Sequence, residues 1–149
     1  MIIIRILMAL HTYTHRLCAL YNITIHIHNI VYTYYIIGIF DGHAGGRCSK
    51  YISRKIPDTL FSNEHFNSNL SNAIRQTFYN INQEFLTLAE RHTLNDGSTA
   101  LCIIIRNHII TIANVGDCRA ILISENCSKV MQLSIDQKPS LPKEKARIG

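Results

Sequence analysis

One short stretch of the sequence combines residue types that could act on metal ions and protons. Asp41, Gly42 and His43 follow an apolar run, and two more glycines come within the next three positions. A carboxylate at the end of a buried strand can bind a hard divalent cation, and a glycine lets its backbone carbonyl approach the same ion. A histidine two residues further on can deliver a proton near neutral pH. An ordinary Asp-Gly turn has the same composition, so both interpretations stay open for the tripeptide alone.

The elements that must position this tripeptide are predicted from periodicity. Residues 31–40 form a continuous run of β-branched and aromatic residues, which predicts a buried strand ending at the turn. Apolar residues at every fourth position from Ala44 predict a helix after the turn, ended by Pro57. An apolar stripe across residues 69–91 predicts a second helix, with the stripe packed on the core.

The second half of the chain predicts antiparallel strands. Residues 98–106 and 109–115 are β-rich runs joined by Asn107 and His108, a two-residue hairpin signal. Near the start of the chain, residues 23–28 alternate with period two and predict another strand. Two more strands, completing a meander, and a last short helix are expected at 118–124, at 129–134 and from Ser140 onward.

His26 and His28 share one face of the strand expected at 23–28. Two histidines in this arrangement either ligate a metal or form the polar face of a half-buried strand, and the second alternative is the more common.

Composition excludes several classes of protein. The chain has 149 residues, a formal net charge of +5 and 47% hydrophobic residues, which predicts one domain or part of one. Basic residues are scattered, so we expect no nucleic-acid partner. There is no apolar run of eighteen residues, so no membrane span is expected. Five cysteines without a C-x-x-C pair predict reduced thiols and an intracellular protein, cytoplasmic or nuclear.

Five segments follow one another in a fixed order along the chain. They are Ile-Phe-Asp-Gly-His-Ala-Gly-Gly-Arg at 39–47, Asp-Gly-Ser-Thr-Ala at 96–100, Ala-Asn-Val-Gly-Asp-Cys-Arg-Ala-Ile-Leu at 113–122, Gln-Leu-Ser-Ile-Asp-Gln-Lys-Pro at 132–139 and Glu-Lys-Ala-Arg-Ile at 144–148. Their order and spacing resemble the metal-dependent protein serine/threonine phosphatases of the PPM (type 2C) family. The resemblance implies an α+β fold, the α-β-β-α sandwich, in which two antiparallel sheets face each other between outer helices. We expect this chain to form only part of that sandwich.

The resemblance also implies roles for individual residues. Asp41 resembles the carboxylate that bridges two Mg²⁺ or Mn²⁺ ions, and Gly42 would add its backbone carbonyl to one of them. His43 resembles the general acid that protonates the departing serine or threonine oxygen. Asp117 stands where family members have an aspartate for a third, weaker metal. The implied reaction is hydrolysis of phosphoserine or phosphothreonine by a metal-activated water, with phosphoproteins as substrates and no covalent enzyme intermediate.

The sequence departs from the family pattern at several places. Cys118 replaces the usual serine or threonine, and Gln137 replaces the usual histidine. The family's upstream Glu-Asp pair has no counterpart, because residues 1–40 contain no acid, and neither Arg5 nor Arg16 is assigned to the family's phosphate-binding arginine. Two further metal aspartates of the family lie beyond the stretch that this chain resembles.

These departures lead to an expectation for the organisation of the chain. Residues 1–33 are expected to be an atypical N-terminal segment, and residues 34–149 an incomplete phosphatase domain, truncated at both ends. An active monomeric phosphatase and a catalytically inactive phosphatase-like interaction module or fragment both remain possible.

Overall fold

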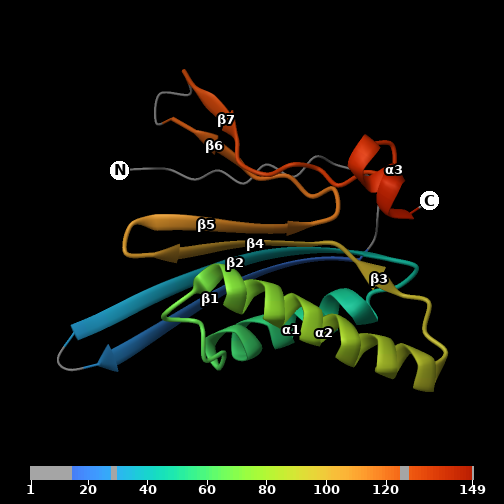
Figure 1. Ribbon diagram of the computed structural model, residues 1–149, viewed down its shortest axis with the longest axis horizontal. Coiled ribbons are helices and arrows are strands. Elements are labelled where there is room, and N and C mark those ends of the chain that lie inside the picture. The colour runs from blue at the N-terminus through green and yellow to red at the C-terminus, as the bar shows by residue number, and fades with distance from the viewer. Residues whose placement is uncertain (1–14, 28–29, 125–127, 149) are drawn as a thin grey trace.

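The computed structural model describes residues 15–27, 30–124 and 128–148 and shows a layered arrangement (Figure 1). Helices α1 and α2 cover one face of the larger sheet, and the segment carrying β6, β7 and α3 lies on the opposite side. The elements are β1 (His15–Ile27), β2 (Ile30–His43), α1 (Arg47–Phe61), α2 (Leu70–His92), β3 (Gly97–Ser98), β4 (Ala100–Arg106), β5 (Ile109–Val115), β6 (Ile121–Ile123), β7 (Val130–Gln132) and α3 (Pro142–Ile148). None of the helices in these ranges is both long and apolar enough to cross a bilayer.

The larger sheet is antiparallel and has the order β1-β2-β4-β5, with the short β3 paired to the end of β2. The predicted strand at 31–40 is therefore confirmed, but β2 continues through Asp41 and Gly42 to His43. The extension exists because Gly42 pairs with Ser98 and His43 with Gly97. The tripeptide is thus the paired end of a strand rather than part of the turn.

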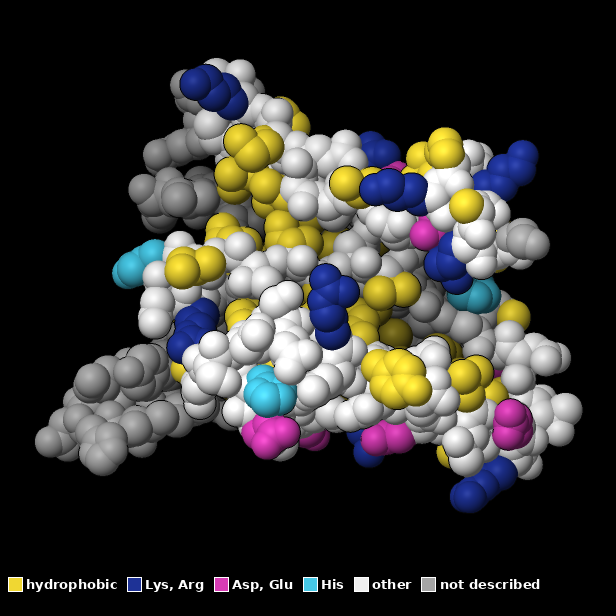
Figure 2. All heavy atoms as spheres, viewed as in Figure 1, with side chains coloured by type: hydrophobic (Ala, Val, Ile, Leu, Met, Phe, Trp, Pro, Cys, Tyr) yellow, Lys and Arg dark blue, Asp and Glu magenta, His cyan; other side chains and the backbone are white. Residues whose placement is uncertain are grey.

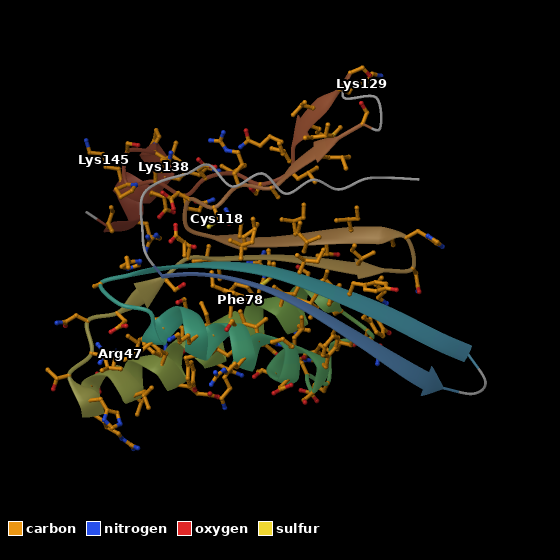
Figure 3. All side chains as sticks on the ribbon, turned by 180° about the vertical axis from the view of Figure 1, so that it is seen from behind. Arg47, Phe78, Cys118, Lys129, Lys138 and Lys145 are labelled. Atoms are coloured by element: carbon orange, nitrogen blue, oxygen red, sulfur yellow. The ribbon has the colours of Figure 1, made fainter. Side chains whose placement is uncertain are left out.

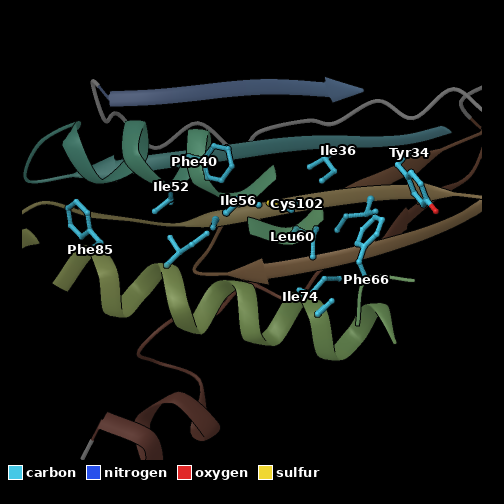
Figure 4. Close-up of a cluster of buried hydrophobic side chains, with 14 of the residues drawn as sticks. Tyr34, Ile36, Phe40, Ile52, Ile56, Leu60, Phe66, Ile74, Phe85 and Cys102 are labelled. Carbon is cyan, nitrogen blue, oxygen red and sulfur yellow. The ribbon is translucent and has the colours of Figure 1, made fainter. Parts of the chain in front are cut away.

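The core has two parts, because side chains of a strand alternate between the two sheet faces. On the helix side, Tyr34, Ile36 and Phe40 of β2 pack with residues of α1 and α2 (Figure 4). On the opposite side, Ile39 packs with residues of β4 and with Ala120, which follows β5. A strand buried on both faces needs a continuous apolar sequence, which is the pattern seen at 31–40.

The two long helices test the sequence predictions differently. Helix α2 agrees with the predicted stripe, and Asn69 caps it by accepting a hydrogen bond from the backbone N–H of Asn72 at 3.1 Å. The helix predicted after the turn is confirmed as α1, but its expected end at Pro57 is wrong, and Ala44, the first residue of the predicted stripe, lies outside it. Ala44 has a φ of 55°, outside the helical region, and Pro57 lies inside the helix. The last turn after Pro57 persists because it buries Leu60, only 1% exposed, in the core.

The hairpin predicted at Asn107 and His108 is confirmed, with φ of 47° and 64° at the two residues, as a primed turn requires. The predicted meander is wrong in one respect, because among the described strands β6 and β7 pair with each other and form a separate two-stranded sheet. The strand predicted at 23–28 is confirmed as far as Ile27, inside β1. His28 lies outside the described residues.

Candidate functional site

The backbone of Asp41 is fixed at the point where β3 gives way to β4. The N–H of Thr99 donates to the carbonyl of Asp41 at 3.0 Å, and the N–H of Asp41 donates to the Thr99 hydroxyl at 3.1 Å. The threonine side chain thus takes the place of a backbone carbonyl in the ladder. Because side chains alternate along a strand, the carboxylate of Asp41 lies on the face that carries Ile39, toward β6 and β7.

His43 is exposed and pairs with Gly97 in the register of β2 and β3. Its imidazole lies against the backbone of Gly97, so closely that a Cβ at position 97 would come within 2.1 Å of Nε2. An exposed imidazole with a free approach from solvent can pass a proton to a bound molecule. Glycine at position 97 is therefore what allows the ring to occupy this place.

The chain after His43 is held by an ion pair between α1 and the start of β3. The buried carboxylate of Asp96 accepts hydrogen bonds from the backbone N–H of Arg47 at 2.9 Å, from Nε at 3.0 Å and from Nη2 at 2.6 Å. These bonds, chiefly those from the guanidinium, hold the pKa of Asp96 below its usual value. Figure 3 shows Arg47 at the start of α1, on the helix side of the sheet.

Asp117 lies in a second turn, after β5, and its side chain is exposed. Gly116 has a φ of 98°, and its carbonyl accepts from the Asn114 amide at 3.2 Å and from the backbone N–H of Gln137 at 2.8 Å. The same Asn114 amide donates to the carbonyl of Ile135 at 2.9 Å. The turn is thereby tied to the segment that follows β7.

An arginine two residues after Asp117 forms an ion pair like that of Arg47 at the first turn. Arg119 donates from Nε and Nη2 to the two carboxylate oxygens of Asp136, at 3.0 and 2.7 Å, and Lys138 lies 3.4 Å from the same carboxylate. The guanidinium of Arg119 is the main reason that the pKa of Asp136 is lowered. Lys138 and Cys118 are labelled in Figure 3, on the side of the sheet opposite the helices.

Thr99 links the two turns. Its hydroxyl accepts from the backbone of Asp41 and lies 3.0 Å from the sulfur of Cys118, the residue after Asp117. The structure therefore brings the sequence-predicted Asp41, Gly42 and His43 together on one strand end and places the turn of Asp117 beside it. Sequence reasoning missed Thr99, Arg47 and Asp96 as parts of this arrangement. The quoted motifs contain all three, but nothing in the spacing indicated their contacts.

The predicted metal ligands are three oxygen donors at this corner. They are the carboxylate of Asp41, the backbone carbonyl of Gly42 and the carboxylate of Asp117. Among the side chains that the structure describes, however, no three His, Cys, Asp or Glu gather closely enough to hold a metal ion. Two divalent cations need more oxygen ligands than these residues supply. The described residues therefore do not fit a complete binuclear centre.

Comparison with known proteins gives a consistent picture. The family model described as protein phosphatase 2C matches residues 16–149. A probable protein phosphatase 2C of Oryza sativa subsp. japonica is 38% identical over 115 residues, covering 76% of this chain and 23% of the relative. A protein phosphatase 2C of Paramecium tetraurelia is 31% identical over 137 residues, covering 83% of this chain and 45% of the relative. The chain thus spans less than half the length of these relatives.

Solved structures share the fold. The serine-threonine phosphatase 2C of Toxoplasma gondii superposes with a TM-score of 0.69 at 20% identity, covering 98% of this chain and 57% of the other. A sex determining protein of C. elegans superposes with a TM-score of 0.67 at 18% identity, covering 92% and 38%. The predicted α+β fold, with antiparallel sheets flanked by helices, is confirmed by these similarities.

Proposed function

The chain belongs to the protein phosphatase 2C family, and from that premise we propose that the protein removes phosphate from phosphoserine and phosphothreonine in proteins. The observation that carries the proposal is the strand end at Asp41, Gly42 and His43. Hydrogen bonds with Thr99 hold the backbone of Asp41 in place, and the imidazole of His43 is exposed to solvent. These three residues resemble the family's metal-binding and acid motif, and they lie on the paired end of β2.

The family generally depends on Mg²⁺ or Mn²⁺, and we propose the same dependence here. Asp41, the carbonyl of Gly42 and Asp117 would contribute part of the ligands for these ions, and the remaining ligands would come from outside the described residues. The role proposed for His43 is proton transfer: its imidazolium protonates the serine or threonine oxygen as the bond to phosphorus breaks. An alkoxide is a poor leaving group, so this proton has a large effect on the rate.

The test is hydrolysis of a phosphothreonine peptide in the presence of Mn²⁺. Turnover should stop when EDTA is added, and His43→Ala should lower kcat by ~100-fold, the scale of general acid catalysis. His92→Ala is the matched control, because His92 is also exposed but lies at the end of α2. Turnover that survives EDTA, or equal losses in the two histidine variants, would contradict the proposal.

The alternative is a catalytically inactive module of the same fold that binds phosphoproteins. The incomplete ligand set in the part of the chain that the structure describes favours it. The two functions differ in one assay: the module would bind the phosphothreonine peptide, measured by fluorescence anisotropy, without releasing phosphate. Phosphate release abolished by EDTA would exclude the module.

A further inference from the structure

Asp96 and Gly97 are neighbours in sequence and contact the chain at His43 and just after it. Gly97 lies under the imidazole of His43, where a Cβ would come within 2.1 Å of Nε2. The hydrogen-bonded register between β2 and β3 fixes this placement, because His43 and Gly97 are paired residues. Any side chain at position 97 would therefore displace the ring.

Asp96 holds the segment that follows His43. Its side chain is fully buried, whereas the side chain of its partner Arg47 is 62% exposed. The carboxylate receives three hydrogen bonds from Arg47, one of them from the backbone N–H that opens α1. A Cβ on Gly45 would lie 2.1 Å from Oδ2 of Asp96, so the loop fits closely around the carboxylate.

The segment between His43 and α1 has a conformation that needs such support. Ala44 has a φ of 55° and Gly45 a φ of 147°, and a left-handed conformation at a non-glycine residue costs about 1 kcal/mol. Strained backbone persists only where its surroundings fix it. The charge-assisted, forked hydrogen bonds between Asp96 and Arg47 are strong and directional enough to do so.

We propose that Asp96, through Arg47 and together with Gly97, is a positioning residue that orients His43 toward the leaving oxygen. This inference rests on the proposed phosphatase function. It assigns part of the specificity for alkyl phosphoesters to Asp96 and Gly97. In the reaction, a water oxygen bonds to phosphorus and the bond to the serine or threonine oxygen breaks. The imidazolium of His43 gives its proton to that oxygen, and the proton lost by water returns to the imidazole through solvent.

The inference predicts a dependence on the leaving group that a purely structural role would not produce. Phosphothreonine needs a proton on its departing alkoxide, whereas p-nitrophenyl phosphate releases a phenolate that is stable near neutral pH. A misplaced His43 should therefore slow the peptide reaction and affect the aryl phosphate much less. A general loss of folding or of metal binding would slow both substrates equally.

The experiment compares kcat and KM for the two substrates in the wild-type chain, Asp96→Asn and Gly97→Ala. Each variant should lower kcat for the phosphothreonine peptide by ~10-fold or more, with less than ~3-fold loss for p-nitrophenyl phosphate. Glu84→Gln is the matched carboxylate-to-amide control, since Glu84 pairs with Tyr51 and Lys55 on the helix surface. Equal losses for both substrates, or no loss in either variant, would overturn the inference.

A second measurement separates failure of this inference from failure of the proposed function. The Hε1–Cε1 NMR resonance of the His43 ring is recorded at one fixed pH in the wild-type chain and in each variant. It should shift in Asp96→Asn and Gly97→Ala and stay in place in Glu84→Gln. If the wild-type chain hydrolyses neither substrate, the phosphatase proposal fails, and an unmoved His43 resonance overturns the positioning role independently.

Discussion

The turn after His43 and the turn at Asp117 are both stabilised by an arginine–aspartate ion pair, but the two pairs differ in burial. In each pair, two guanidinium nitrogens of the arginine donate hydrogen bonds to an aspartate from another segment. Arg47 donates to Asp96, and Arg119 donates to Asp136. Asp96 is fully buried and also accepts a backbone N–H, whereas Asp136 is 13% exposed and has Lys138 as a further partner.

The difference in burial between the two aspartates agrees with the role proposed for each turn. The turn with the buried aspartate follows His43, whose ring must be placed accurately for proton transfer. The other turn contains the exposed Asp117, which is proposed to bind a third, more weakly held metal ion. We therefore expect substitutions at the first turn to lower activity and stability more than substitutions at the second.

The largest effect is expected when the two candidate metal carboxylates are compared. Asp41→Asn should lower turnover of the phosphothreonine peptide by more than ~100-fold, because it removes the ligand proposed to serve both ions. Asp117→Asn should lower it by ~10-fold or less, because that carboxylate is exposed and peripheral. Steady-state kinetics across a range of Mn²⁺ concentrations measures both, and equal losses would remove the distinction between the turns.

The next largest effect concerns stability. Asp96→Ala should lower the free energy of unfolding by about 2–3 kcal/mol, because α1 loses the acceptor of its first N–H and the charged bonds of Arg47. Asp136→Ala should lower it by less than half as much, since the Asp136 side chain is 13% exposed whereas that of Asp96 is fully buried. Urea unfolding followed by circular dichroism gives both values, and a larger loss in Asp136→Ala would reverse the comparison.

The stability difference should also depend on pH. The pKa of Asp96 is lowered in the folded protein, mainly by hydrogen bonds from the Arg47 side chain, so its contribution is fully present above the unfolded pKa of about 4. The contribution is lost as the pH falls through the folded pKa. The gap in unfolding free energy between the wild-type chain and Asp96→Asn should therefore be widest near neutral pH and narrow in acid.

Asp136→Asn should show the same direction with a smaller change, because the pKa of Asp136 is lowered by the same kind of partner in a more exposed place. Urea midpoints measured at several pH values check both variants. If the difference in unfolding free energy between the wild-type chain and Asp96→Asn widened on acidification, the carboxylate of Asp96 would not be the charged partner of Arg47.

The sequence predicted those features that are encoded locally. Helix α2 follows from its apolar stripe, and the hairpin follows from two residues that tolerate positive φ. The five motifs that follow one another along the chain indicated the family, and the comparisons confirm it. Pro57 misled the prediction of α1, because burial of the following turn outweighed the local preference of proline.

The contacts that hold the site could not be predicted in this way. Arg47 and Asp96 are 49 positions apart, and their hydrogen bonds depend on how β3 aligns with the end of β2. Periodicity reports which face of an element is buried, but it does not report which buried polar groups meet. Basic side chains are scattered over the surface shown in Figure 2. Their scattered positions in the sequence did not indicate that Arg47 has a specific partner.

The smallest effect is expected at the contact that joins the two turns. Cys118→Ser should change the free energy of unfolding by less than about 0.5 kcal/mol, because a hydroxyl can replace the weak Sγ contact with the Thr99 hydroxyl at a half-buried position. Cys102→Ser is the matched control. Cys102 is 1% exposed, and burial raises the pKa of its thiol to about 12.

A hydroxyl at position 102 would be placed in an apolar core and should destabilise the protein by about 1–3 kcal/mol. Thermal melts of the two variants measure this contrast. A loss in Cys118→Ser as large as that in Cys102→Ser would mean that the sulfur contributes mainly by packing. The two turns would then be joined by apolar contact between Cys118 and the sheet, rather than through the hydroxyl of Thr99.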